Sequence, residues 1–344
     1  MKVLVTGGAG YIGSTLVPIL LEAGHSVVVV DRFYFGKETL GAASDKFGAK
    51  LTMVQADVRS LDESIMAGVD AVVDLAGISN DPSCELDPEL TKSINLRGNQ
   101  STMQLAQRAG VKRYVYASSC SVYGRGETTG LTEKSNLHPV SLYARCKADC
   151  ETALFALQGR GMCVTALRFA TVFGLSPRMR FDLAVNVMTK NAYTQGKITV
   201  DGGGKQWRPF VHVADVGETI RDILGQPVES VDGQVFNVGH EANNVRVLNL
   251  AYRVRDALPT TQIVMAPTDP DLRDYNVEFD KLHELMPDRL FRTIDYGIQE
   301  VLGALKSGEI DPDDRRWYTM RHYVFLSEVE RTYRQVALDG RVLA

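Results

Sequence analysis

The sequence predicts an α/β protein, in which a Rossmann-type, doubly wound parallel sheet is followed by a smaller C-terminal α/β lobe. Three observations predict this fold class. Short apolar runs alternate with longer segments of helical periodicity, the first run leads directly into a glycine-rich turn, and the alternation breaks after about Gly174. The expected division is a first domain over 1–174, to which 211–239 is expected to return, and a second lobe over 175–344.

The strands expected in the first domain are rich in β-branched and apolar residues, as strands covered on both faces should be. They are Lys2–Thr6, Ser26–Val30, Leu51–Ala56, Ala71–Leu75, Tyr114–Ala117 and Cys163–Arg168. The helices expected between them are Tyr11–Ala23, Leu61–Ala67, Pro88–Ala109 and Leu142–Leu157. Gly24 and Gly110 stand where a helix end favours a residue that tolerates positive φ.

The second lobe mixes short apolar runs with helical segments, and Pro, Gly and Asp gather in its connections. Strands are expected at Ile198–Val200, Phe210–His212, Val235–Val238 and Gln262–Ala266. Helices are expected at Phe181–Tyr193, Val213–Leu224, Val247–Ala257 and Tyr296–Lys306. We expect this lobe to bind the substrate.

The composition excludes several classes of protein. A formal net charge of −4 predicts no nucleic-acid partner, because such a partner needs a basic face. No apolar stretch reaches the about 18 residues that a membrane-spanning helix needs. The six histidines have no ligand spacing, so no metal is expected. The five cysteines form no C-x-x-C pair, which favours a reducing cytoplasm over a disulfide framework.

The first strand runs into Gly7-Gly8-Ala9-Gly10-Tyr11-Ile12-Gly13, which fits G-x-G-x-x-G. Such glycines let the turn close and let the backbone approach a pyrophosphate resting on the helix N-terminus. Asp31 ends the second strand, 18 residues past Gly13, where a carboxylate can bind the adenosine ribose. It would repel the 2′-phosphate of NADP, so NAD is the expected cofactor, with Arg32 as the one dissenting residue.

Further cofactor contacts are expected where other strands end. Asp57 and Val58 close the third strand and could bind the adenine amine, although a helix-capping Asp fits Asp57 equally well. After the fourth strand the expected contacts are Leu75, Ala76 and Gly77.

Tyr143 and Lys147 lie at i and i+4, on one face of an expected helix. A nearby positive charge lowers the pKa of a tyrosine and makes the phenol an acid or base usable near neutral pH. Taken alone, this pair is better explained as part of a solvated helix face than as a catalytic pair. Ser119 favours the catalytic interpretation because it ends the fifth strand, at the carboxyl edge where such sheets bind ligands.

The glycine loop, Asp31, Asp57, Ser118-Ser119-Cys120-Ser121-Val122-Tyr123-Gly124 and the Tyr143–Lys147 pair resemble the extended short-chain dehydrogenase/reductase family. Within it, the chain is most similar to the NAD-dependent epimerases and dehydratases of nucleotide sugars. The resemblance extends over nearly the whole chain and is strong to about Gly174. It implies a Ser–Tyr–Lys triad that oxidises a sugar carbon, C4, by hydride transfer to NAD, after which the keto sugar rotates and is reduced on its other face.

The resemblance also implies supporting roles. Asn95 is similar to a family asparagine that supports the lysine through water, although a polar residue on a half-buried helix is an equal interpretation. Arg208 would grip the pyrophosphate of a nucleotide-diphosphate sugar, even though Pro209 replaces the usual Asp. Arg273 is a second phosphate ligand. Thr171 replaces a phosphate-binding Asn, which leaves the particular sugar open. The other expected substrate contacts are Ser79, Ser119, Cys120, Ser121, Arg178, Arg180 and Asn186, of which the last three fit a surface role equally well.

Other activities stay open at this point. One is a 4-ketoreductase or dehydrogenase that exchanges its cofactor, and another is a non-catalytic NAD-sensing protein, which would be expected to lose Tyr143 or Lys147. A 4,6-dehydratase is disfavoured, because such members carry an Asp and a Glu where this chain has Cys120 and Ser121. A homodimer is expected through the helices within 88–109 and 142–157, which carry more apolar positions than one buried stripe requires.

Overall fold

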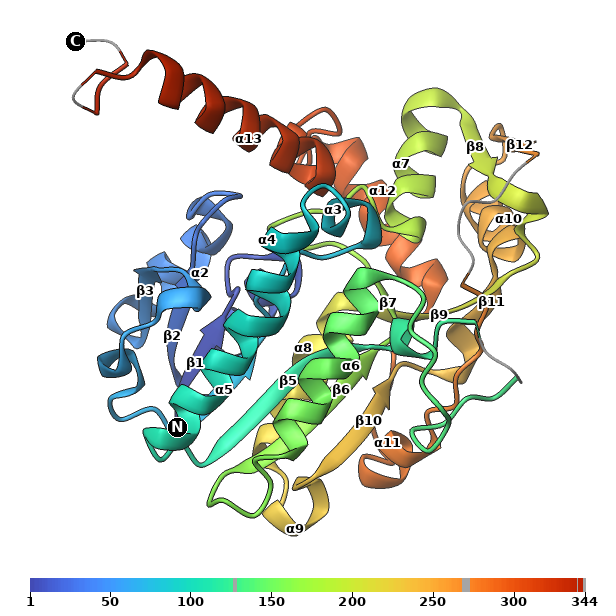
Figure 1. Ribbon diagram of the computed structural model, residues 1–344. Helices are drawn as coiled ribbons and strands as arrows, with labels where there is room; N and C mark the ends of the chain where they lie inside the picture. Colours follow the sequence, from blue (N-terminus) through green and yellow to red (C-terminus); the bar gives the residue numbers. More distant parts are fainter. Residues whose placement is uncertain (126–128, 268–272, 339, 343–344) are drawn as a thin grey trace.

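The computed structural model describes residues 1–125, 129–267, 273–338 and 340–342. In this part of the chain seven parallel strands form one sheet in the order β10-β6-β5-β4-β1-β2-β3 (Figure 1). The strands are β1 Lys2–Thr6, β2 Ser26–Asp31, β3 Leu51–Gln55, β4 Ala71–Asp74, β5 Arg113–Ser119, β6 Cys163–Phe169 and β10 Gln234–Val238. The strand order reverses between β1 and β4, and doubly wound sheets bind their ligands at such a point. The expected fold class is confirmed.

The continuous apolar runs of the strands are explained by burial on both faces. Val27 and Val29 of β2 pack into the hydrophobic cluster on one face of the sheet, whereas Val28 and Val30 pack into the cluster on the other. A strand covered on one face only would alternate apolar and polar residues instead. All six strands expected in the first domain are present, with bounds within two residues of the expected ones.

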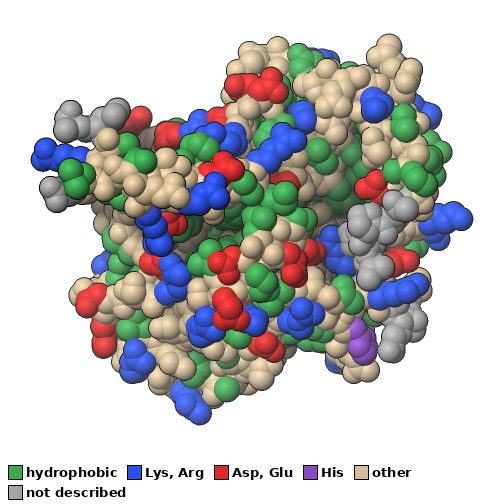
Figure 2. All heavy atoms as spheres, turned by 45° about the horizontal axis from the view of Figure 1, so that its top comes forward, with side chains coloured by type: hydrophobic (Ala, Val, Ile, Leu, Met, Phe, Trp, Pro, Cys, Tyr) green, Lys and Arg blue, Asp and Glu red, His purple; other side chains and the backbone are tan. Residues whose placement is uncertain are grey.

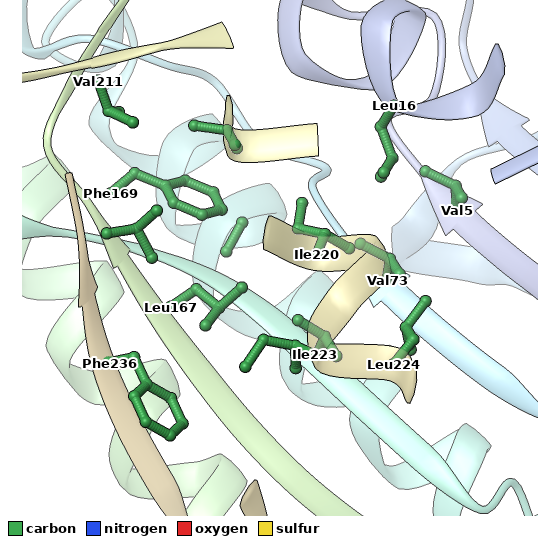
Figure 3. Packing of buried hydrophobic residues seen from close by; sticks show 14 of the residues in the cluster. Val5, Leu16, Val73, Leu167, Phe169, Val211, Ile220, Ile223, Leu224 and Phe236 are labelled. Atoms are coloured by element: carbon green, nitrogen blue, oxygen red, sulfur yellow. The ribbon is translucent and has the colours of Figure 1, made fainter. Parts of the chain in front are cut away.

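Helices cover both faces of this sheet (Figure 1). α1 and α8 lie on one face, and α5 and α6 lie side by side on the other. Figure 3 shows Ile220, Ile223 and Leu224 of α8 among side chains of the strands, including Leu167 and Phe236. The helices of this unit are α1 Tyr11–Glu22, α2 Gly41–Phe47, α3 Asp81–Cys84, α4 Pro88–Lys92, α5 Asn99–Arg108, α6 Leu142–Phe155, α8 Val213–Gly225 and α9 Val228–Val231.

The single helix expected over 88–109 is divided into three pieces. α4 and α5 are separated by a π-helical turn, Ser93–Gly98, a widened geometry often found at functional sites. The turn places Asn95 with its side chain against the backbone of the loop after β4. The helix expected over 61–67 is only a short 3-10 helix, Glu63–Met66.

A smaller unit lies beside the carboxyl ends of the main strands (Figure 1). Its described strands form a three-stranded sheet, β11-β9-β7, and a two-stranded sheet, β12-β8. Phe173, Phe210 and Leu250 belong to its own hydrophobic core. The chain leaves this unit through α8 and returns to the main sheet as β10, which pairs with β6. The strands are β7 Thr171–Phe173, β8 Lys197–Val200, β9 Trp207–His212, β11 Asn244–Arg246 and β12 Gln262–Met265.

The remaining helices are α7 Ala184–Gln195, α10 Val247–Ala257, α11 Asp280–Leu285, α12 Ile294–Ser307 and α13 Thr319–Val336. The sequence analysis did not predict α13. Only Thr319 and His322 of this helix are buried, and every residue from 327 to 336 is exposed. Two buried residues give no apolar stripe, so periodicity could not reveal it. Its far end projects from the molecule (Figure 1). None of the described helices is both long and apolar enough to cross a membrane.

Candidate active site

A cavity of about 710 Å³ lies at the carboxyl edge of the main sheet, between the sheet and the smaller unit. The face turned forward in Figure 2 is hollowed near its centre. The lining comes from segments that are far apart in the sequence, and most of the predicted site residues belong to it. These are Gly7, Gly10, Tyr11, Ile12, Gly13, Asp31, Asp57, Val58, Leu75, Ala76, Gly77, Ser79, Ser119, Ser121, Tyr143, Lys147, Thr171, Arg178, Arg180, Arg208 and Arg273.

Three predicted residues do not line this cavity. Asn95 accepts the N–H of Ile78 at 2.8 Å and donates to its carbonyl at 2.8 Å, so it fixes the loop after β4. The Cys120 thiol is fully buried and donates to the Arg168 carbonyl at 3.2 Å. Asn186 is fully buried and accepts the N–H of Gly174 at 3.0 Å. The expectation that Cys120 and Asn186 touch the substrate is corrected by this placement, because both side chains satisfy their polar atoms inside the protein.

The glycine loop forms the cofactor end of the cavity. Gly7 has a φ of +67°, which only glycine adopts without strain. A Cβ on Gly13 would lie 2.5 Å from the Gly7 carbonyl oxygen and 2.5 Å from the Gly8 Cα, so α1 rests directly on the loop. The first N–H groups of α1, from Tyr11 onward, have no partner within the helix. They can donate to an anion, such as a diphosphate, at the N-terminus of this helix.

Asp31 closes the neighbouring strand and lines the cavity. Its carboxylate accepts the N–H of Ala9 at 3.0 Å and the N–H of Phe33 at 2.7 Å. Burial raises the pKa of Asp31, and the two backbone hydrogen bonds oppose that rise. The side chain is therefore held in one orientation by the backbone, with acceptor capacity left for ribose hydroxyls.

Asp57 is held by two arginines. Arg59 donates to it at 2.6 Å and Arg32 at 2.8 Å, and it also caps the short helix that follows. The hydrogen bond from the Arg59 side chain keeps the pKa of Asp57 well below its usual range. Arg32 was the one residue that favoured NADP, but its guanidinium is paired with Asp57. It therefore does not offset the negative charge of Asp31 at the end of β2.

Ser119, Tyr143 and Lys147 meet where β5 and α6 face the cavity. Ser119 lies close enough to the Tyr143 phenol to lower its pKa. The Lys147 ammonium is buried, donates to the Ala117 carbonyl at 2.5 Å and lies 5.7 Å from the centre of the Tyr143 ring. A hydroxyl, a phenol and an ammonium are therefore fixed within one pocket by two adjacent elements.

The acidity of Tyr143 differs from the sequence expectation. Burial raises its pKa, and the neighbouring Cys84 and Asp81 raise it further. The charge of Arg180 and the neighbouring Ser119 oppose that rise. Burial also lowers the pKa of Lys147. The prediction that the pKa of Tyr143 is lowered is wrong for this structure, because desolvation of the phenol is the largest influence on it.

Cations line the other end of the cavity. Arg208 extends from β9, donates to the Trp207 carbonyl at 2.7 Å and lies over the Tyr275 ring at 5.5 Å. Arg273 pairs with Asp81 at 3.0 Å. Near them, the buried hydroxyl of Ser121 has no hydrogen-bond partner.

Several lining residues were missed by sequence reasoning. Asp182 holds Arg180 through two hydrogen bonds of 2.6 and 3.1 Å, so this arginine is already neutralised. Its position beside the basic loop could have suggested it. Tyr34, Phe35 and Tyr323 line the cofactor end, and no local pattern marks them. Arg178, Arg180 and Asn186 are all buried, which excludes the surface role considered for them.

Outside the cavity, the described residues contain one group with metal-ligand geometry, His240, Glu241 and His283, whose ligand atoms lie within 4.8 Å of one another. The His240 Nδ1 accepts the N–H of Ala242 at 3.1 Å. A backbone N–H can only donate, so the ring proton of neutral His240 is on Nε2 and neither nitrogen keeps a lone pair for an ion. We assign no metal to this group.

Fold and site together define a Rossmann-type dinucleotide-dependent enzyme with a serine, a tyrosine and a lysine in its cavity. The protein belongs to the NAD dependent epimerase/dehydratase family, whose sequence profile matches residues 3–239. This confirms the resemblance, and NAD is the cofactor. The residues present fit it, because the glycines let α1 begin directly at the loop, with its first N–H groups available to a diphosphate, and because the Asp31 carboxylate stands at the end of β2 and lines the cavity.

Relatives within this family differ in their reactions. The UDP-glucose 4-epimerase of Lactobacillus helveticus is 30% identical over 293 residues, which cover 79% of this chain and 87% of that protein. The UDP-N-acetyl-alpha-D-glucosaminuronate decarboxylase of Bacillus cytotoxicus is 31% identical over 255 residues, which cover 70% and 75%. The solved structure of an NAD-dependent NDP-hexosamine 5,6-dehydratase of tunicamycin biosynthesis has a TM-score of 0.80 at 25% identity, over 91% of this chain and 99% of that one.

Proposed function

We propose that the protein is an NAD-dependent nucleotide-sugar epimerase that transiently oxidises one sugar carbon, C4, through Ser119, Tyr143 and Lys147. The observation that carries this proposal is that Ser119, Tyr143 and the buried Lys147 ammonium line one cavity at the carboxyl edge of the sheet, with the ammonium 5.7 Å from the centre of the Tyr143 ring. The same cavity continues to Arg208 and Arg273, so it offers a dinucleotide end and a separate cationic end.

The chain's residues would divide the proton chemistry between them. The Ser119 hydroxyl holds the reacting sugar oxygen, and the Tyr143 phenolate oxygen takes its proton as the carbonyl forms. NAD, which the glycine loop and Asp31 would hold, would supply a reversible hydride acceptor for the sugar carbon. Tyr143 then gives the proton back to the oxygen of the rotated sugar, so each turnover ends with the enzyme in its starting state. The Lys147 ammonium, 5.7 Å from the centre of the Tyr143 ring, would offset part of the desolvation cost of the phenolate by its charge.

The cationic end would hold the diphosphate of the sugar nucleotide. Arg208 offers a planar guanidinium, which suits a phosphate, and Arg273 approaches from another segment. The unpartnered hydroxyl of Ser121 and Thr171 also line the cavity. Hydrogen bonds from short side chains suit sugar hydroxyls.

The surroundings of the triad support epimerisation over 4,6-dehydration. Elimination of water needs an acid near C6 and a base near C5. The Cys120 thiol lies outside the cavity, and burial raises its pKa far above the neutral range. Ser121 has no proton affinity suited to a base. No acid–base pair therefore follows Ser119 directly.

The proposal is tested by incubating the protein with UDP-, GDP-, dTDP- and CDP-hexoses and following the products by NMR. We expect one hexose to equilibrate with its C4 epimer without added oxidant or reductant. Accumulation of NADH would indicate a dehydrogenase instead. A product lighter by one water would indicate a dehydratase, and release of carbon dioxide from a uronic acid would indicate a decarboxylase.

We also propose a homodimer in the cytoplasm. All five cysteines are unpaired and buried, as in proteins of reducing compartments. Pairing through α5 and α6 rests on the family resemblance, because the exposed residues of these helices include Ser101, Gln104, Asp149 and Thr152, which are polar. Of the apolar residues, Met103, Leu105, Leu142 and Leu154 are buried within the protomer, whereas Phe155 is partly exposed and Leu90 of α4 is exposed. Light scattering at micromolar concentration should give twice 37.9 kDa, and a monomer would contradict the proposal.

A further inference from the structure

The start of α13 closes the cofactor end of the cavity. The His322 Nε2 donates to the Tyr34 carbonyl at 2.6 Å, and its ring lies 5.2 Å from that of Phe35. The Tyr323 ring lies 5.7 Å from Phe35 and 6.1 Å from Tyr34. Tyr34, Phe35 and Tyr323 all line the cavity. The loop that follows Asp31 is therefore fastened to a helix almost 300 residues further along the chain.

Arg178 is the cation of this corner. Its side chain is 2% exposed, lines the cavity and has its guanidinium 3.7 Å from the centre of the Phe35 ring. One terminal nitrogen donates to the Thr319 hydroxyl at 2.9 Å, whereas the buried Nε has no partner. Among the described residues, no carboxylate forms an ion pair with Arg178. A buried guanidinium without a counterion is costly, which points to an anionic ligand.

The neighbouring Arg180 differs from Arg178 in its ion pairing. Arg180 has the same sign but is neutralised by Asp182. Burial, together with the like charge of Arg180, lowers the pKa of Arg178 to about 9, so the guanidinium is still charged at neutral pH. Arg178 and Arg180, two residues apart in the sequence, thus differ: Arg180 forms an ion pair with a carboxylate, and among the described residues Arg178 forms none.

We propose that Arg178 binds the diphosphate of NAD and that Tyr323 of α13 covers the same end of the cavity, so that the dinucleotide stays bound through many turnovers. The sequence analysis had placed Arg178 among the substrate contacts. Its surroundings assign it to the cofactor, since its backbone N–H donates to Ser14 of α1 at 3.3 Å and its side chain touches Phe35 and Thr319. Its charge also acts on Asp31.

Retention of the cofactor follows from this arrangement. The N-terminus of α1 and Arg178 both offer positive charge to one anion, and Tyr323 of α13 lines the same cavity. An epimerase returns the hydride to the same sugar and has no need to exchange its cofactor, whereas a reductase must release it. The inference that NAD is retained rests on the proposed epimerase function. The inference that Arg178 binds the diphosphate does not rest on it.

Binding to variants tests the assignment without any turnover. The variants are Arg178→Met and Tyr323→Ala. The matched controls are Arg334→Met and Tyr333→Ala, both on the exposed half of α13. The probes are ADP, adenosine and UDP, measured by calorimetry on protein freed of nucleotide. Dissociation of NADH is followed by stopped-flow fluorescence, and thermal unfolding of each variant reports folding.

We expect Arg178→Met to weaken ADP by about 10- to 100-fold while adenosine and UDP change less than 2-fold, because only ADP brings a phosphate to this end. Tyr323→Ala should speed NADH dissociation by about 10-fold, and both controls should match the parent protein. Weakening of UDP instead of ADP, or of both alike, would overturn the assignment to the cofactor. Unchanged NADH dissociation in Tyr323→Ala would overturn the covering role of α13. If Arg178→Met does not fold, Arg178→Lys replaces it, with the same probes and a smaller loss for ADP expected.

Discussion

The two ends of the cavity are built in different ways. At the cofactor end, the main contacts come from backbone held close together: the glycine loop rests on α1, and Asp31 is oriented by the N–H groups of Ala9 and Phe33. At the substrate end, the main contacts are long side chains, Arg208 and Arg273, which reach in from separate segments. The cofactor end is thus fixed by main-chain geometry, and the substrate end by side-chain identity.

This difference explains how one family can serve several reactions. Relatives of this chain are named as epimerases, decarboxylases and dehydratases, and the shared dinucleotide end needs no change for any of them. Side chains at the other end can be exchanged without disturbing the backbone that holds the cofactor. Substitutions should therefore separate the two ends: changes at the cofactor end should damage cofactor binding, and folding too where they break the backbone fit, whereas changes at the substrate end should damage only substrate binding.

The largest effect is expected on turnover, for a substitution of Tyr143. Tyr143→Phe removes the only proton carrier that the proposed reaction uses and should lower turnover by about 10²–10⁴-fold. The ring stays, so NAD affinity should change little. Steady-state kinetics and NADH fluorescence titration measure the two quantities. Turnover within a factor of two of the parent protein would show that another group moves the proton.

Gly13→Ala should be the most damaging change at the cofactor end. The added Cβ would meet backbone atoms of Gly7 and Gly8 at 2.5 Å, which cannot move aside as a flexible side chain can. We expect about 3 kcal/mol less stability and loss of tightly bound NAD. Denaturant unfolding and the nucleotide content of the purified protein report these losses.

Gly303→Ala is the matched control for that change. A Cβ there meets nothing within 4 Å, and the residue lies within α12. Alanine favours a helix over glycine, so this variant should be unchanged or more stable by about 0.5–1 kcal/mol. Equal destabilisation by both substitutions would refute the close fit between loop and helix.

Arg208→Lys should weaken substrate binding and leave cofactor binding unchanged. Lysine keeps the charge but loses the planar fork, so substrate KM should rise by about 10- to 30-fold, which is roughly 1.5–2 kcal/mol. NAD affinity and unfolding temperature should stay at parent values. Arg255→Lys, an exposed position on α10, provides the baseline. A drop in NAD affinity instead would mean that the ends are coupled.

The smallest effect is expected for Asp31→Asn. The amide retains an acceptor for the ribose but loses the negative charge, so NAD should weaken by only about 5-fold, or roughly 1 kcal/mol. NADP should weaken less or bind more tightly, because the repulsion of its 2′-phosphate is removed. Calorimetry with both dinucleotides gives the ratio of affinities, and a ratio equal to that of the parent protein would show that Asp31 does not select the cofactor.

The sequence by itself determined the features that depend on consecutive residues. The strand β1, the glycine turn and α1 follow one another within Lys2–Glu22, and each signal is local, so their bounds were predictable. The i, i+4 spacing of Tyr143 and Lys147 on α6 is a local property in the same way.

Tertiary structure decided the features that depend on distant neighbours. Periodicity could not show that α13 covers the loop after Asp31, because this helix buries only Thr319 and His322. Residue type could not show that Cys120 turns away from the cavity. The acidity of Tyr143 was misjudged for the same reason: spacing reveals a nearby charge, but desolvation depends on every atom that the fold brings around the phenol.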